Sequence, residues 1–237
     1  VNDHSALYAF LARKKCASKR LVGNIVADIR APSWDDYLGH LSQHRRKMMR
    51  KKIRTLETEH DVTLEVIRDR EGYLQWFDKI REMIDVRGRK DRPQRSDAYM
   101  ECVKETHSQL FSRGQMMLFV LRAGETMIAY RIGVIQGRTY YDWNTNYDPA
   151  WQRYSPGLVC VAYVIRQLIE EGFTKYDHMA GVYNYKLGFS PQHEMRHNYL
   201  FVMGDRSLPS AMFREYQLVW RDRVKPYYQR YVRPIFK

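Results

Sequence analysis

One segment of the chain has the residue types of an anion-binding loop. Directly before an apolar stretch with helical periodicity stands the sequence Gln152-Arg153-Tyr154-Ser155-Pro156-Gly157. A loop that opens a helix points free backbone N–H groups at an anion, and the helix dipole adds to the attraction. Small residues keep the approach open, so the segment predicts a phosphate site. A Ser-Pro pair is also an ordinary helix start, because proline suits the first helical position.

Asp142 is a candidate general base. It lies in an aromatic stretch that we predict as a strand, between Tyr141 and Trp143. Dry surroundings raise the pKa of a carboxyl group, and acyl transfer to an amine or hydroxyl needs a base. An aspartate in a strand can equally be a hydrogen-bonded structural group. Both interpretations stay open.

A third candidate group is formed by Asp177, Tyr185 and Lys186. Asp177 and Lys186 are nine residues apart, and Gly181 between them permits a tight reversal of the chain. Lys186 could hold a phosphate or an oxyanion, Asp177 could hold the lysine or the acceptor, and Tyr185 could donate a proton to the leaving group. The alternatives are a buried ion pair that fixes the short helix, and aromatic packing of Tyr185.

Other catalytic and metal-binding patterns are absent from the sequence. There is no G-x-S-x-G segment and no Walker A loop. His178 and His193 have no Cys or Ser partner pattern, so we expect structural or surface roles for both. Cys16, Cys102 and Cys160 are far apart and odd in number, which predicts free thiols and no disulfide frame, zinc site or structural metal.

Hydrophobic periodicity predicts the elements that carry these residues. An antiparallel meander is predicted from three apolar and aromatic segments with tight turns, 116–122, 126–135 and 138–146. It continues into a helix, a strand, a short helix and a last strand, at 157–170, 175–179, 183–187 and 195–203. Upstream we predict two helices, a strand and two further helices, at 33–41, 42–58, 62–68, 71–86 and from about 96. Residues 1–31 show little pattern.

This element order, with the loop and two further stretches, resembles the GNAT acyltransferase superfamily. Gln152 and Gly157 match the GNAT acyl-CoA loop Q/R-x-x-G-x-G/A, and Ser155 replaces its first glycine. The pattern Asp177-x3-Gly181-x3-Tyr185-Lys186-x2-Phe189 resembles the CelD/BcsL-type branch, whose relatives are FemAB-type peptidyltransferases. The basic segment from Leu41 to Glu57 resembles a helix of the same branch. The resemblance covers about 33–203.

One position departs from the ordinary GNAT pattern. Many GNAT enzymes end this region with Tyr-x-Lys-Leu-Gly-Phe, in which the tyrosine protonates the departing thiolate. Here Asn184 stands at the tyrosine position, between Tyr183 and Tyr185. An asparagine side chain cannot supply that proton. The departure therefore favours the divergent branch.

The resemblance implies an α+β fold in which helices flank a central, mostly antiparallel sheet. We expect three regions: a basic helical region at 1–60, a GNAT-like domain at 61–205, and a basic aromatic helical tail at 206–237. Family members are commonly longer at the N-terminus. The first region is therefore expected to be the remnant of a second GNAT-like half, and the start at Val1 is typical of a fragment or a processed product.

The resemblance also implies an acyltransferase that uses acyl-CoA, acetyl-CoA first, as co-substrate, with no tightly bound cofactor. Catalysis would involve Asp142, Asp177, Tyr185 and Lys186, and donor binding Gln152, Arg153, Ser155 and Gly157. The expected acceptor is an amine or hydroxyl of a sugar, a polysaccharide precursor or another envelope-related metabolite, as in exopolysaccharide biosynthesis. Two alternatives are an aminoacyl-tRNA-dependent FemAB-type transferase, although no heptad run predicts its coiled-coil arm, and a non-catalytic basic module.

The formal net charge of +13 indicates an anionic partner. The excess is concentrated in four clusters, at 13–20, 45–54, 87–95 and 214–237. CoA phosphates, tRNA, anionic lipid and acidic glycan all fit, and some of these charges will only solvate helix faces. No stretch reaches the roughly 18 apolar residues of a membrane span, and no signal peptide is visible. We therefore expect a cytoplasmic protein, with the inner face of the membrane as an alternative location, and the resemblance implies a bacterial one.

Overall fold

The computed structural model describes residues 6–13, 17–20, 23–86, 96–197 and 199–202. Backbone contacts divide the chain into two units, 21–198 and a smaller one made of 1–20 with 199–237. In the smaller unit, helix α1 (Ala6–Arg13) precedes strand β1 (Ala17–Arg20), which pairs antiparallel with β9 (Tyr199–Val202). The predicted loop at 87–95 and tail at 206–237 lie outside the described residues.

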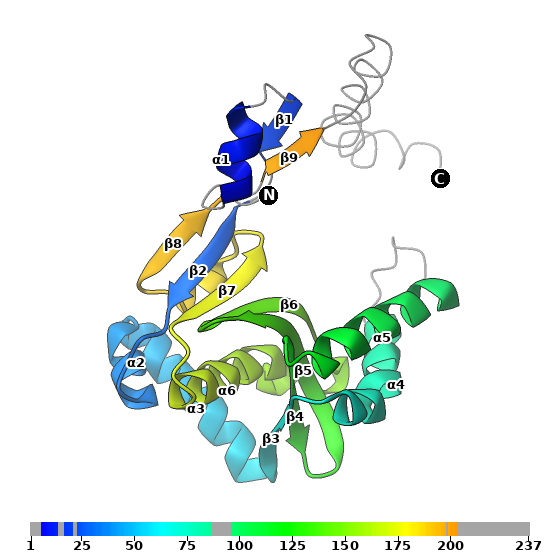
Figure 1. The fold of residues 1–237 in the computed structure, drawn as a ribbon. Coiled ribbons are helices and arrows are strands. Elements are labelled where there is room, and N and C mark those ends of the chain that lie inside the picture. Colours follow the sequence, from blue (N-terminus) through cyan, green and yellow to red (C-terminus); the bar gives the residue numbers. More distant parts are fainter. Residues whose placement is uncertain (1–5, 14–16, 21–22, 87–95, 198, 203–237) are drawn as a thin grey trace, which may run out of the picture. The chain divides into compact units, whose positions relative to one another are not determined.

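The larger unit is built on a seven-stranded sheet with the order β3-β4-β5-β6-β7-β2-β8 (Figure 1). Every neighbouring pair is antiparallel except β6 and β7, which are parallel. The strand bounds are β2 Asn24–Asp28, β3 Val62–Ile67, β4 Met116–Ala123, β5 Thr126–Gln136, β6 Thr139–Tyr147, β7 Lys175–Ala180 and β8 His193–Arg196. The mixed, mostly antiparallel sheet with flanking helices confirms the predicted fold class, and β4, β5 and β6 form the predicted meander.

Helices cover both faces of this sheet (Figure 1). Their bounds are α2 Trp34–His40, α3 Gln43–Glu59, α4 Arg70–Val86, α5 Asp97–Ser112, the 3-10 helix η1 Pro149–Tyr154, α6 Pro156–Glu170 and α7 Asn184–Gly188. Side chains of α2, α3 and α6 share one buried core with the sheet, and those of α4 and α5 share a second. Serine caps at the starts of α2, α3 and α5, each accepting a backbone N–H, explain why these helices begin where the sequence predicts.

The N-terminal region is only partly helical, which corrects one expectation. β2 lies between β7 and β8 inside the sheet, although we predicted no strand in 1–31. Its residues Ile25, Val26 and Ala27 are fully buried. The last predicted strand, 195–203, is also two strands, β8 and β9. The boundaries at residues 60 and 205 stay predictions, but β2, α2 and α3 are all integrated with the larger unit.

Gly133 makes the closest backbone approach in the meander, and we predict that it cannot be replaced by alanine without loss of stability. A Cβ atom at this position would lie 2.3 Å from the carbonyl oxygen of Tyr141 and 2.4 Å from the ring of Tyr140, so the strands would have to move apart. Overpacking of this kind costs about 1–3 kcal/mol or more. Denaturant unfolding of Gly133→Ala should show this loss.

Gly39 in α2 provides the matched control, because no atom lies within 4 Å of a Cβ added there. Gly39→Ala should be neutral or stabilising by up to about 1 kcal/mol, since alanine is the better helix former. Equal stability of Gly133→Ala and the wild type would contradict the tight packing of β5 against β6.

Candidate active site

The parallel strands β6 and β7 separate partway along their length. They pair only from Thr139 to Tyr141 and from Lys175 to Asp177, while β6 continues to Tyr147 and β7 to Ala180. We call the unpaired ends, 142–147 and 178–180, the β6–β7 opening. Carboxyl ends of parallel strands are where open α/β sheets bind ligands, so this opening is the first place to look for a site.

The loop predicted to bind an anion lies at the start of α6, the helix that follows β6. Ser155 adopts the left-handed conformation, with φ 56° and ψ 51°, which is uncommon for a residue other than glycine. Its carbonyl oxygen accepts the N–H groups of Leu158 and Val159, at 2.9 and 3.2 Å. Pro156 has no N–H, and in the described part of the chain the N–H of Gly157 has no acceptor. One backbone donor at the positive end of the helix dipole is therefore available.

The side chain of Ser155 does not cap α6, which argues against an ordinary helix start. Its hydroxyl oxygen lies 2.6 Å from the ammonium group of Lys52 in α3 and accepts a hydrogen bond from it. Lys52 is half-buried and belongs to the basic segment 45–54. This contact places the basic segment beside the loop, and the sequence did not single out Lys52 among its seven basic residues.

Gln152 and Arg153 are placed differently from Ser155 and Gly157. Both lie in η1 and are exposed. The guanidinium of Arg153 is 3.3 Å from a carboxylate oxygen of Glu59, at the end of α3. Of the four predicted donor-binding residues, only Ser155 and Gly157 therefore lie at the start of α6 itself.

Asp142 forms a buried ion pair with Arg131 of β5. The guanidinium also lies 3.2 Å from the hydroxyl of Tyr176 and 3.4 Å from the carbonyl oxygen of Gly157. Burial raises the pKa of the Asp142 carboxyl, and the attraction of Arg131 opposes that shift. The pair links β5 and β6 to the first turn of α6, so these contacts favour the structural interpretation of Asp142.

Arg131 is a buried charged residue beside the candidate site that the sequence analysis missed. It stands between Tyr130 and Ile132 in an otherwise apolar strand and is 3% exposed. A charged residue in the middle of such a strand needs a buried partner. That signal was present in the sequence and could have found the pair.

Asp177 and Lys186 bond other groups of the protein, so the ion pair that was the structural alternative for them does not form. The ammonium of Lys186 donates to the carbonyl oxygens of His178, Met179 and Ala180, at 2.6, 3.1 and 3.0 Å. The carboxylate of Asp177 accepts the N–H of Met179 at 2.7 Å and a side-chain N–H of Asn24 at 3.3 Å. Among the described residues, no salt bridge joins the two side chains.

The remaining candidates surround this group. Tyr185 is half-buried in α7, and its ring stacks on that of Tyr183 at 6.2 Å with an interplanar angle of 12°. His178 is buried, and its Nε2 lies 3.1 Å from the hydroxyl of Ser190. His193 is exposed and its Nδ1 bonds the carbonyl of Ser190. Both histidines thus have the structural or surface positions expected of them.

Within the ranges that the structure describes, no three His, Cys, Asp or Glu side chains come together as a metal site. None of the described helices combines the length and the apolar character that crossing a membrane requires.

Comparison with known proteins gives a family and a set of similar folds. The family model described as "Acetyltransferase (GNAT) domain" matches residues 43–187, more than half of the chain. No curated protein matches.

Three solved structures illustrate the likeness of fold. The C-terminal domain (DUF2156) of an Agrobacterium fabrum protein assigned as a lysylphosphatidylglycerol synthetase is 12% identical, with a TM-score of 0.58 over 90% of this chain and 69% of that one. FemX is 12% identical, with a TM-score of 0.57 over 85% of this chain and 70% of that one. L-PGS from Bacillus licheniformis is 15% identical, with a TM-score of 0.55 over 90% and 70%. At these identities the likeness concerns the fold alone.

The matched residues include the meander, the separation of β6 from β7, the loop at the start of α6, and most of α7. The region that the family model recognises is therefore the region that builds the site. The chain belongs to the acetyltransferase (GNAT) domain family and is an acyltransferase.

Proposed function

We propose that the protein transfers an acyl group from acyl-CoA, acetyl-CoA first, to an amine or hydroxyl of a sugar, a polysaccharide precursor or another envelope-related metabolite. The arrangement at the start of α6 is the observation that supports acyl-CoA as the donor. There the N–H of Gly157, which has no acceptor among the described residues, stands within one turn of the hydroxyl of Ser155 and the ammonium of Lys52 that bonds it. A Cβ atom at Gly157 would lie 3.1 Å from the ring of Tyr147 in the β6–β7 opening. A backbone donor and an ammonium group together suit a pyrophosphate.

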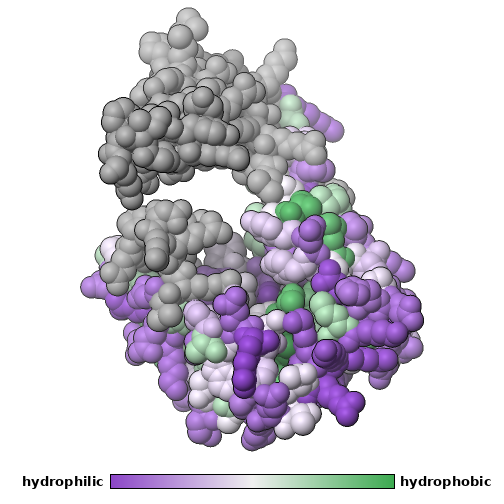
Figure 2. Space-filling model, turned by 180° about the vertical axis from the view of Figure 1, so that it is seen from behind, coloured by the Kyte–Doolittle hydropathy of each residue, from purple (hydrophilic) through white to green (hydrophobic). Residues whose placement is uncertain are grey.

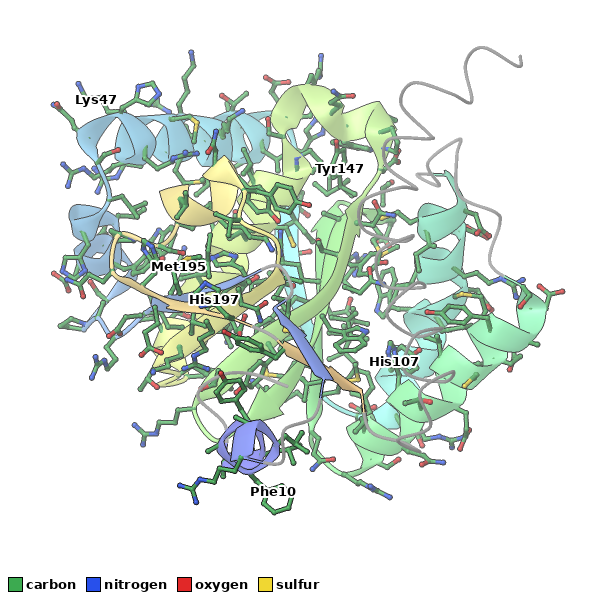
Figure 3. The ribbon with its side chains drawn as sticks, turned by 90° about the horizontal axis from the view of Figure 1, so that it is seen from above. Phe10, Lys47, His107, Tyr147, Met195 and His197 are labelled. Atoms are coloured by element: carbon green, nitrogen blue, oxygen red, sulfur yellow. The ribbon has the colours of Figure 1, made fainter. Side chains whose placement is uncertain are left out.

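The basic residues of α3 extend this anion-binding surface in two directions. Arg45 is seven residues before Lys52 and lies against the end of α7, since a Cβ at Gly188 would be 2.3 Å from its guanidinium. Lys47 is exposed and points away from the protein (Figure 3). Figure 2 shows hydrophilic side chains over much of the face seen from behind. We assign the donor phosphates to the side of α3 that carries Arg45 and Lys52.

In the proposed reaction, the acceptor nitrogen or oxygen attacks the thioester carbonyl and the C–S bond breaks. The acceptor loses one proton and the CoA thiolate gains one. We retain Asp142 and Asp177 as candidates for the base and Tyr185 as the proton donor. Their support differs: burial raises the pKa of Asp177, which suits a base, whereas Asp142 is held by Arg131.

We predict that Lys52→Met weakens acetyl-CoA binding about tenfold, because losing one charge-assisted hydrogen bond costs roughly 1.4 kcal/mol of binding free energy. Lys47→Met is the matched control, since it removes the same charge from the same helix at an exposed position. Titration calorimetry should show weaker binding only for Lys52→Met, and the difference should shrink as salt is added. Equal affinities of the two variants would remove Lys52 from the donor site.

The exposed basic stripe of α3 supports a second candidate, an aminoacyl-tRNA donor. Its outer face carries Lys47, Lys51 and Arg54, and none of the three forms a salt bridge with another described residue. Nucleic acid would bind there with a strong salt dependence. The same stripe could hold a non-catalytic chain on anionic lipid or glycan. A thermal-shift comparison of acetyl-CoA with tRNA separates the two donors, because a ligand of the native state raises its stability.

A further inference from the structure

Strand β7 contains one extra residue at the point where it leaves β6. Between the pairs Val26–Asp177 and Asn24–Ala180, β2 advances by two residues and β7 by three. Met179, within this interval, has φ 55° and is one of only two described non-glycine residues with positive φ. Residues Asp177–Ala180 thus form a β-bulge, which we call the β7 bulge, and it begins at the last residue of β7 that pairs with β6.

Strand β6 has a matching irregularity at the same level. Between the pairs Val134–Tyr141 and Ile132–Asn144, β5 advances by two residues and β6 by three. A bulge bends its strand and increases the local twist. Two bulges on neighbouring strands, both starting where the pairing ends, therefore account for the β6–β7 opening.

The β7 bulge is fixed by the two side chains that the sequence pattern singled out. An ammonium group has three N–H donors, and Lys186 directs them at the three successive carbonyl oxygens of residues 178–180. Asp177 accepts the N–H of Met179 from within the bulge. Both residues are buried, at 4% and 1% exposure. Lys186 therefore has no donor left for a substrate.

We infer that Lys186 is a positioning residue that holds the β7 bulge and so keeps the β6–β7 opening in the shape that binds the acyl donor. The inference rests on the proposed function, in that acyl-CoA occupies the opening. It deepens that function by assigning Lys186 to the geometry of the site. It also removes Lys186 from the candidates for proton transfer or oxyanion binding.

The decisive test uses the strained backbone of Met179. Glycine adopts positive φ without steric cost, so Met179→Gly should keep the bulge even when the lysine is gone. We expect Lys186→Met to weaken acetyl-CoA binding at least tenfold and to raise KM more than it lowers kcat. The double variant Lys186→Met/Met179→Gly should bind acetyl-CoA to within about threefold of Met179→Gly alone, which is its reference because Met179 itself lies in the opening.

A catalytic lysine predicts the opposite, because a glycine at position 179 cannot replace an ammonium group in chemistry. A double variant as impaired as Lys186→Met would overturn the inference. If Lys186→Met does not fold, Met179→Val provides a second route, since a β-branched residue disfavours positive φ while Lys186 remains. It should weaken acetyl-CoA binding in the same way, and wild-type affinity in this variant would also overturn the inference.

A measurement made without acetyl-CoA tests the role of Lys186 separately from the assignment of the donor. The N–H of Gly181 bonds the carbonyl of Gly23 at 3.0 Å, just beyond the bulge. Its hydrogen exchange should be faster in Lys186→Met and should return to the wild-type rate in the double variant. If the wild type does not bind acetyl-CoA but this pattern holds, the donor assignment fails and the role of Lys186 stands. Unchanged exchange in Lys186→Met would refute that role whatever the donor.

Discussion

Replacing Arg131 by methionine should destabilise the folded protein by about 3–5 kcal/mol, because it leaves the Asp142 carboxylate buried without its partner. Arg131 and Asp142 are 3% and 7% exposed, so water cannot substitute for the lost guanidinium. The variant should also lose affinity for acetyl-CoA, since Arg131 bonds the carbonyl oxygen of Gly157 in the first turn of α6. Denaturant unfolding measures the first effect and titration calorimetry the second.

The stability lost in Arg131→Met should become smaller as the pH falls. Burial already raises the pKa of Asp142, and the attraction of Arg131 is the largest of the interactions that oppose that shift, ahead of the Tyr176 hydroxyl and Lys186. Without Arg131 the folded-state pKa rises further above the unfolded value. The penalty is therefore present above the new folded-state pKa and is relieved as the pH falls through it. Arg131→Met and the wild type should become more similar in stability toward acid pH.

The double variant Arg131→Met/Asp142→Leu is the control for this prediction. Removing both charges leaves no unpaired carboxylate, and an apolar pair of similar volume is often as stable as a buried ion pair. We expect it to recover most of the stability lost by the single variant. A loss below 1 kcal/mol in Arg131→Met would mean that Asp142 is already well solvated or otherwise paired.

Acidification from pH 7.5 to 5 should cost the wild type about 2 kcal/mol through His107 alone. Burial lowers the pKa of His107 to about 4, against 6.5 in the unfolded chain. The unfolded state therefore takes up a proton in this window that the folded state does not, and stability falls as the pH falls. His107 lies on α5 in the helical layer formed with α4 (Figure 3), with Nδ1 at 3.2 Å from the hydroxyl of Tyr73.

Other buried groups also affect how the free energy of unfolding depends on pH. The pKa of His178 is also lowered by burial, so it adds to the loss. Burial raises the pKa of both Asp142 and Asp177, and these carboxyls oppose the loss near their own folded-state pKa values. His107→Asn isolates one contribution, since its side-chain amide can still meet Tyr73. The slope of unfolding free energy against pH between 7.5 and 5 should be clearly flatter in this variant, and an unchanged slope would exclude His107 as its source.

Most elements of the larger unit were predictable because their periodicity is local. The meander alternates and turns at Gly124 and Gly137, both with positive φ, and α6 carries a continuous apolar stripe that ends before Gly172. β2 was missed for a physical reason. It is only five residues long and buried along almost its whole length, so it has no alternation to show. Its place depends on β7 and β8, which are more than 140 residues away in the sequence.

The site was predictable in its loop and less so in its side chains. The start of α6 followed from Ser155 and Gly157 and from the free N–H groups of a helix. The partners of Asp177 and Lys186 did not, because two opposite charges nine residues apart suggest an ion pair. The sequence cannot show that each of them binds backbone groups instead. Their contacts depend on the β7 bulge, which is a feature of the pairing between strands that are far apart in the sequence.

The most direct test of the proposed donor site is amide hydrogen exchange of the wild type with and without saturating acetyl-CoA. If the donor lies in the β6–β7 opening with its phosphates on the first turn of α6, exchange should slow at Gly157 and in β6 beyond Tyr141. Slower exchange confined to other parts of the chain, or none while acetyl-CoA is bound, would contradict the proposed donor site.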